Sequence, residues 1–225
     1  MQIIAPPHGP RMLILSASIS DTESIFQENI PRATEKRKRE HRTGRWLLQE
    51  GLKKWGFHNL SNLEVRRTKE RAPYLQWIEG TWQRSPLPDV SISHCENAAV
   101  VCLIEPGFHV GIDIEPSDRT IQSNAFDMMA KGEELEMLRI QPEKALEVWT
   151  KKEAIQKAKK LGMHMNPREI NLNDLDLKLV TFTKDDLLIS IAWQRVTEVS
   201  ENPEDVLIKE IRSKMLENPE FKVGC

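Results

Sequence analysis

A stretch near the middle of the chain carries the pattern that most constrains its fold. Val90 and Ile92 alternate with serines, and Ala98–Ile104 is an uninterrupted apolar run. After the turn Glu105-Pro106-Gly107, the segment "HVGIDIE" alternates again. Alternation with a period of two is typical of a strand with one buried face, and a short apolar run is typical of a strand buried on both faces. The stretch therefore predicts a three-stranded meander.

Helical and further strand signals flank this stretch. A basic helix is predicted to start at Asn29-Ile30-Pro31 and to end at Trp55-Gly56, and a second helix to run from Pro142 to Leu161-Gly162. "MLILSASI" predicts one strand, "LDLKLVTFTKDDLLISIAWQRV" predicts two around a Lys-Asp-Asp turn, and "EDVLIKEIRSKML" predicts a C-terminal helix. These elements indicate the α+β class.

Composition narrows the functional classes. The chain has 225 residues, 39% of them hydrophobic and 29% charged, which is typical of a folded globular protein that needs neither disulfides nor a metal for its core. A net charge of −2 gives no overall attraction to nucleic acid or to an anionic membrane. Three cysteines without framework spacing, and the lack of a long apolar run, favour the cytoplasm.

Two acids lie inside the last strand of the predicted meander. Side chains of a strand alternate between faces, so Asp113 and Glu115 share one face with Gly111, while the apolar residues share the other. Gly111 is expected to leave open space beside the acids. Two neighbouring carboxylates suit a hard cation such as Mg²⁺. The alternative is an edge strand whose acids simply face water.

The second predicted helix carries a related stripe. Trp149, Glu153 and Lys157 recur at a spacing of four residues, so they lie on one face. An exposed Glu to Lys pair is the simpler interpretation, but the tryptophan indicates a partly buried seam. A third carboxylate and a lysine beside the pair Asp113 and Glu115 would suit phosphate chemistry.

Taken together, these motifs resemble the 4'-phosphopantetheinyl transferases of the larger, surfactin-synthetase-activating type. "VGIDIE" is followed by "WTKKEAIQK" at about the separation found in that family. "GRWLLQEGL" is similar to its arginine-bearing helix, "RRTKERAPYL" to its basic loop, and "VSISHCE" to one of its strand ends. The basic loop departs from the family at Arg71-Ala72-Pro73, where many relatives have Gly-Lys-Pro.

The resemblance implies a fold of two similar α/β halves in a pseudo-dimer, with coenzyme A bound in the cleft between them. We expect residues 1–106 to form the N-terminal half, which holds the nucleotide, and residues 107–225 to form the half with the magnesium and catalytic motifs. The fused arrangement implies a monomer. The implied activity is transfer of 4'-phosphopantetheine from coenzyme A to a serine of an acyl or peptidyl carrier protein, with release of adenosine 3',5'-bisphosphate.

The resemblance also implies roles for individual residues. The metal ligands would be Asp113, Glu115 and Glu153, binding Mg²⁺ or Mn²⁺. The catalytic residues would be Glu153, which activates the acceptor hydroxyl, Lys157, which steadies the leaving group, and His94. The contacts to coenzyme A would come from Arg45, Arg67, Ser93, His94, Asp113 and Lys157. Glu133 matches a further acid near the metal.

Two alternatives stay open at this point. A Mg²⁺-dependent nuclease or nucleotide hydrolase would use the same carboxylates and lysine. A non-catalytic adaptor that binds carrier proteins would not need them.

Overall fold

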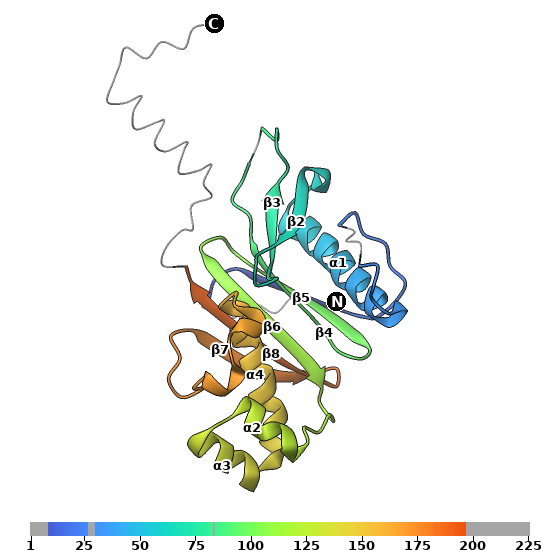
Figure 1. Ribbon diagram of the computed structural model, residues 1–225. Coiled ribbons are helices and arrows are strands. Elements are labelled where there is room, and N and C mark those ends of the chain that lie inside the picture. The colour runs from blue at the N-terminus through green and yellow to red at the C-terminus, as the bar shows by residue number, and fades with distance from the viewer. Residues whose placement is uncertain (1–8, 27–29, 83, 197–225) are drawn as a thin grey trace, which may run out of the picture. The chain divides into compact units, whose positions relative to one another are not determined.

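Each half of the protein contains a three-stranded antiparallel sheet with one long helix on its outer face (Figure 1). The computed structural model describes residues 9–26, 30–82 and 84–196. The first half comprises β1 (Met12–Ser18), α1 (Glu35–Trp55), β2 (Leu63–Arg67), β3 (Pro73–Trp77), β4 (Asp89–His94) and β5 (Ala98–Ile104). The second half comprises β6 (Phe108–Pro116), α2 (Phe126–Met129), α3 (Gly132–Ile140), α4 (Ala145–Ala158), β7 (Lys178–Lys184) and β8 (Leu187–Arg195).

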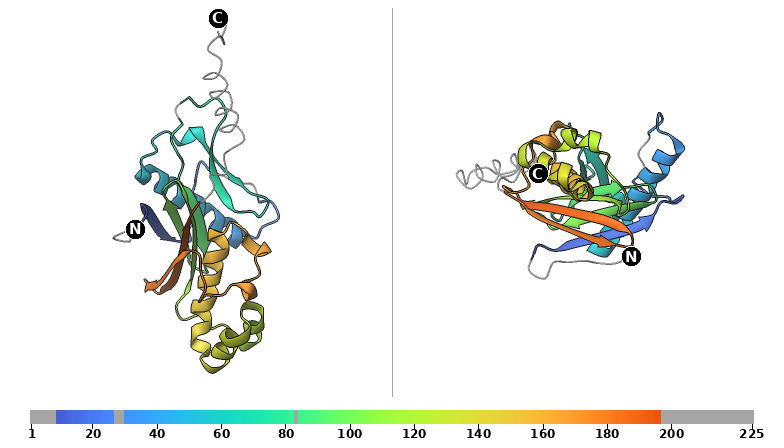
Figure 2. Two further views of the ribbon diagram at one scale, coloured as in Figure 1. Left: turned by 90° about the vertical axis from the view of Figure 1, so that its left-hand side faces the viewer. Right: turned by 90° about the horizontal axis from the view of Figure 1, so that it is seen from below.

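The two halves pack sheet against sheet (Figure 2). The strand orders are β1-β5-β4 and β6-β8-β7, and β2 and β3 form a separate hairpin. Alternation along the strands produces the layers, since Leu13 and Leu15 of β1 face α1 while Met12 and Ile14 face the second sheet. On that second sheet, Ile112 packs inward, and the opposite face is covered by α4. The α+β class and the two similar halves are therefore confirmed.

The predicted meander is wrong in its third strand. β4 and β5 do pair, but β6 pairs with β8 instead of β5. The turn at Glu105-Pro106-Gly107, where Gly107 has φ +89°, carries the chain from one sheet to the other. Alternation determines which face of a strand is buried, but it does not determine the strand with which it pairs.

Side chains of β4 cover the open edge of β6. The backbone N–H of Val110 donates to Asp89 Oδ2 at 2.8 Å, and that of Ile112 donates to Ser91 Oγ at 3.0 Å. Lys160, which follows α4, pairs with Asp89 at 2.6 Å. Polar side chains of the first half thus replace a neighbouring strand and hold β6 in place against β4.

Gly111 does not leave open space, as the sequence had suggested. A Cβ atom built there would lie 1.9 Å from the carbonyl oxygen of Ala154 and 2.4 Å from the backbone N of Ala158. The missing side chain lets the backbone of α4 rest directly on β6. The residue therefore sets the distance between the strand and the helix.

Helix α1 begins four residues later than predicted. Thr34 is the N-cap, and its side chain accepts a hydrogen bond from the backbone N of Arg37 at 3.3 Å. Pro31 lies in a turn before the helix, and Asn29 lies outside the described residues. The predicted end is confirmed, because Gly56 adopts φ +117° and its N–H bonds the last carbonyls.

The remaining predictions hold where the structure describes them. "MLILSASI" forms the edge strand β1, and β7 and β8 are joined at Asp185 and Asp186, which both have positive φ as a tight hairpin turn requires. The second helix is shorter than predicted, since a 3₁₀ turn at Pro142–Lys144 precedes α4. The predicted C-terminal helix lies outside the described residues. Among those residues, no helix is long and apolar enough to span a membrane.

Candidate active site

Asp113 is the centre of a polar cluster where β6, β4 and α4 meet. Lys157 Nζ lies 2.7 Å from Asp113 Oδ1 and donates to Ser93 Oγ at 3.0 Å. Ser93 Oγ in turn donates to Asp113 Oδ1 at 2.8 Å. The strand from the first half and the helix from the second half thus both contribute groups to one carboxylate. The sequence predicted all three of these residues.

The second oxygen of Asp113 is a buried acceptor that lacks a partner. The residue is 6% exposed, and its Oδ2 has no hydrogen-bond partner among the described residues. An unsatisfied buried carboxylate oxygen costs free energy. Such an atom in a native fold calls for a ligand, and carboxylate oxygens suit a hard cation.

Glu115, two residues after Asp113 on β6, and Glu153 on α4 are both partly buried. Burial raises the pKa of each above its usual 4.5, and the neighbouring Asp113 raises both further. Lys157 opposes this effect at Glu153, and Arg119, which pairs with Glu115 Oε1, opposes it there. Neighbouring acids whose pKa values are raised by burial and by each other are typical of a cation site.

The carboxylates of this cluster are suitable ligands for a divalent cation, but basic side chains of the protein pair with two of them. Within the part of the chain that the structure describes, no three His, Cys, Asp or Glu side chains gather in metal-binding geometry. Instead, the two acids of β6 each have a cationic partner, Lys157 for Asp113 and Arg119 for Glu115. A bound cation would use the orphaned Oδ2 of Asp113 while Lys157 stays on Oδ1, and it would compete with Arg119 for Glu115.

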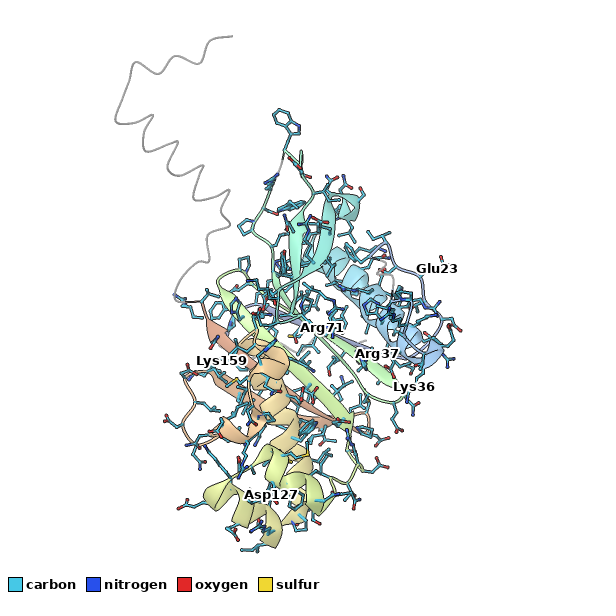
Figure 3. The ribbon with its side chains drawn as sticks, in the orientation of Figure 1. Glu23, Lys36, Arg37, Arg71, Asp127 and Lys159 are labelled. Atoms are coloured by element: carbon cyan, nitrogen blue, oxygen red, sulfur yellow. The ribbon has the colours of Figure 1, made fainter. Side chains whose placement is uncertain are left out.

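A basic cavity of about 210 Å³ lies beside this cluster. Arg37 on α1 and Arg71 on the loop between β2 and β3, both labelled in Figure 3, line this cavity. Arg45 and Arg67, which the sequence predicted, line it, and so does His94. Its cationic lining residues are Arg37, Arg45, Arg67, Arg71, Lys157 and Lys160. A cavity with this lining suits a ligand with several phosphates.

His94 stands at the edge of the cavity between a cation and an acid. Arg37 Nη1 contacts its Nε2, and Glu40 Oε2 lies 3.4 Å from its Nδ1 and 3.3 Å from Arg37 Nη1. Arginine can only donate, so the imidazole accepts from Arg37. Burial, with help from Arg37, lowers the pKa of His94 to about 4. The ring is therefore neutral at physiological pH.

Sequence reasoning missed Glu40 and gave Arg37 no role in the site. Both lie on α1, where Arg37, His41 and Arg45 recur every four residues and line the cavity. Other cations of the basic segment pair with surface acids, Lys38 with Glu35 and Arg42 with Asp21. The four-residue spacing was the available signal, and the excess of cations obscured it.

Glu133 does not join the other acids. It is exposed at the start of α3 and lines a separate cavity of about 980 Å³. The next residue, Glu134, pairs with Lys152, which is fully buried and donates to the carbonyl of Met129 at 2.6 Å. Lys152 precedes Glu153 on α4, so this pair ties the α2–α3 segment to the helix that carries the catalytic candidates.

Comparison with known proteins identifies both halves. Residues 26–104 match the 4'-phosphopantetheinyl transferase N-terminal domain, and residues 109–208 match the 4'-phosphopantetheinyl transferase superfamily. No curated protein sequence matched the chain significantly. The two matches follow one another in the order of the two halves and cover most of the sequence. The chain therefore belongs to the 4'-phosphopantetheinyl transferase superfamily, as an enzyme of its two-domain type.

Proposed function

We propose that this enzyme transfers 4'-phosphopantetheine from coenzyme A to a serine of an acyl or peptidyl carrier protein and releases adenosine 3',5'-bisphosphate. Family membership implies transfer of this group to carrier proteins. The observation that carries the finer proposal is the contact of Lys157 with Asp113 and Ser93 at the edge of the basic cavity.

The cavity suits the nucleotide end of coenzyme A. Its arginines come from α1 and from the β2–β3 hairpin, so a bisphosphorylated nucleotide would contact two parts of the first half. Arg71 lines the cavity next to Ala72, at the loop where relatives often carry lysine, and supplies positive charge there. Neutral His94 and Ser93 would contact the phosphates at the edge nearest Asp113.

The metal ligands we propose are Asp113, Glu115 and Glu153, with Mg²⁺ or Mn²⁺ as the ion. When bound, the cation would offset the charge of the phosphate oxygens during transfer. The orphaned Oδ2 of Asp113 and the raised pKa values of the other two acids support this assignment.

Glu153 would accept the serine proton, and Lys157 would neutralise the leaving group. The serine oxygen attacks the β-phosphorus, and its proton passes to the carboxylate of Glu153. The bond from the β-phosphorus to the bridging oxygen breaks, and the departing α-phosphate keeps that oxygen and its electron pair. Lys157 Nζ neutralises the charge that develops there. A positioned base contributes roughly 10²- to 10⁴-fold to such a step.

Each chain carries both halves and therefore one complete set of these groups, so we propose that the monomer is active. The compartment we propose is the cytoplasm, which membership of this family supports. The domain boundary near residues 106–107 stays a prediction.

The test is mass spectrometry of several apo carrier proteins incubated with the enzyme, coenzyme A and Mg²⁺. We expect each substrate carrier to gain one phosphopantetheine on its serine. Glu153→Gln should lower the rate at least 10²-fold, whereas Glu147→Gln, on the same helix and paired with Lys151 at the surface, should not. Wild-type enzyme that modifies no carrier but cleaves DNA would favour the nuclease alternative.

A further inference from the structure

The turn after β6 brings an arginine back to one of the proposed metal ligands. Arg119 N donates to the carbonyl of Pro116 at 3.0 Å, which closes the turn, and Ser117 N donates to the carbonyl of Asp186 at 2.8 Å, which anchors it to the β7–β8 turn. As a result, Arg119 Nη1 reaches Glu115 Oε1. The backbone hydrogen bonds of this turn thus hold Arg119 close to Glu115.

The two partners differ in their freedom to move. The side chain of Glu115 is 13% exposed, whereas that of Arg119 is 46% exposed. The guanidinium can therefore leave into solvent without disturbing the core. Water can solvate the half-exposed guanidinium once it leaves, so this pair can be exchanged for another cation.

The surroundings of the pair are acidic. Glu115 and Arg119 line a cavity of about 490 Å³, and its remaining charged lining residues are Glu40, Glu96 and Asp118. Among the described residues that line this cavity, Arg119 is the permanent cation. Two carboxylates of β6 thus have a cationic partner in the metal-free protein, but only Lys157, the partner of Asp113, also lines the basic cavity.

We propose that Arg119 is a displaceable counter-ion of the metal site. It neutralises Glu115 in the metal-free protein and competes with a divalent cation for this carboxylate, so it lowers the affinity of the site for that cation. The inference rests on the proposed function, because it takes Glu115 as a metal ligand. Arg119 thus sets the metal concentration at which the enzyme becomes active.

The experiment is a Mn²⁺ titration of the full chain, followed by the electron paramagnetic resonance signal of the free ion, with Mg²⁺ as competitor. Arg119→Gln removes the charge, and we expect it to lower the Kd about three- to tenfold at low ionic strength. Raising the salt to about 1 M should shrink this difference, because the Debye length falls to about 3 Å. Arg119→Lys keeps the charge and should stay near the wild-type Kd.

Arg139→Gln is the matched control. Arg139 has a side chain 51% exposed, and it pairs with Glu136 and Asp127 on the α2–α3 segment, where Figure 3 labels Asp127. Its Kd for Mn²⁺ should equal that of the wild type. This comparison separates the effect of removing the charge next to Glu115 from the effect of removing any surface charge.

Four results would overturn the inference. Equal Mn²⁺ affinity in wild type and Arg119→Gln would show that the pair does not compete with the ion. Weaker Mn²⁺ binding would show that Arg119 holds Glu115 in a binding position instead. Weaker binding of adenosine 3',5'-bisphosphate without metal would make Arg119 a phosphate ligand. If neither protein bound Mn²⁺, the metal assignment under the proposed function would fail as well, which is distinguishable from the first result.

Discussion

Lys157 on α4 neutralises Asp113 on β6 at 2.7 Å, and Asp113 is almost fully buried. Lys157→Met should therefore lower the free energy of unfolding by about 1.5 to 3 kcal/mol, because it leaves a buried carboxylate without its charged partner. Urea denaturation measures this loss, and adding Mg²⁺ should restore part of it by compensating Asp113.

Lys159→Met is the control for this variant. Lys159 pairs with the exposed Asp176 at 2.6 Å, and this surface pair should contribute less than about 1 kcal/mol. Equal losses in the two variants would mean that Lys157 does not stabilise the charge of Asp113.

Glu153→Gln should stabilise the metal-free protein at neutral pH. The folded-state pKa of Glu153 is raised above 4.5, so the folded state binds its proton more tightly than the unfolded state does. The corresponding stability is fully present below pH 4.5 and is lost as the pH rises through the folded-state pKa. The neutral amide avoids this loss, so the melting temperature of the variant should exceed that of the wild type at pH 7 and converge with it near pH 4.

Mg²⁺ should close the gap at pH 7 by raising the melting temperature of the wild type alone. Scanning calorimetry from pH 4 to pH 8 tests both effects. A melting temperature that is lower for Glu153→Gln across this range would contradict the burial of an ionised carboxylate.

His94 should stay neutral over the physiological range. Burial and Arg37 lower its pKa to about 4, compared with about 6.5 for a free imidazole. The unfolded state therefore binds this proton first as the pH falls, and the contribution of His94 to stability is lost between about pH 6.5 and pH 4. We expect its ring signals in NMR spectra, assigned with His94→Gln, to be constant from pH 8 to pH 5.5. A transition near pH 6.5 would show that the ring is not shielded from protons in solution.

Lys152 should couple α4 to the α2–α3 segment. Its amine is fully buried against Glu134 and the carbonyl of Met129, so Lys152→Met should cost roughly 3 to 5 kcal/mol of unfolding free energy by leaving both without a donor. Adding Glu134→Leu should recover a large part of the loss, because replacing a whole buried pair by apolar residues is often nearly neutral.

A double-mutant cycle in urea measures the coupling of Lys152 and Glu134. Lys151→Met, which breaks a pair with the half-exposed Glu147, should cost less than about 1 kcal/mol. Additive effects of Lys152→Met and Glu134→Leu would mean that the two side chains stabilise the protein independently.

The elements of the second half were largely readable from the sequence, and their partners were not. Alternation in "VGIDIEP" correctly separated Ile112 from Asp113, because the period of two is a local property of a strand. The pairing of β6 with β8 depends on residues about 80 positions apart, and the turn at Gly107 is equally compatible with a hairpin and with a change of sheet. The meander was wrong for that reason.

In the candidate site, too, local motifs were readable from the sequence and contacts between distant elements were not. Asp113, Ser93 and Lys157 followed from motifs, and the structure brings them together. Glu40 was missed because its importance arises only where α1 meets the end of β4, and a buried acid in a basic helix has no local signature. Arg119 was missed because a turn, not a helical or strand period, returns it to Glu115.

Gly111 makes the spacing between the acids of β6 and the groups of α4 a property of two backbones in contact, where a single added carbon would lie 1.9 Å from Ala154 O. Side-chain exchanges elsewhere in the core can therefore alter stability while the strand and helix keep the same separation. The distance across the proposed reaction centre is therefore fixed at Gly111, where even a methyl group is too large.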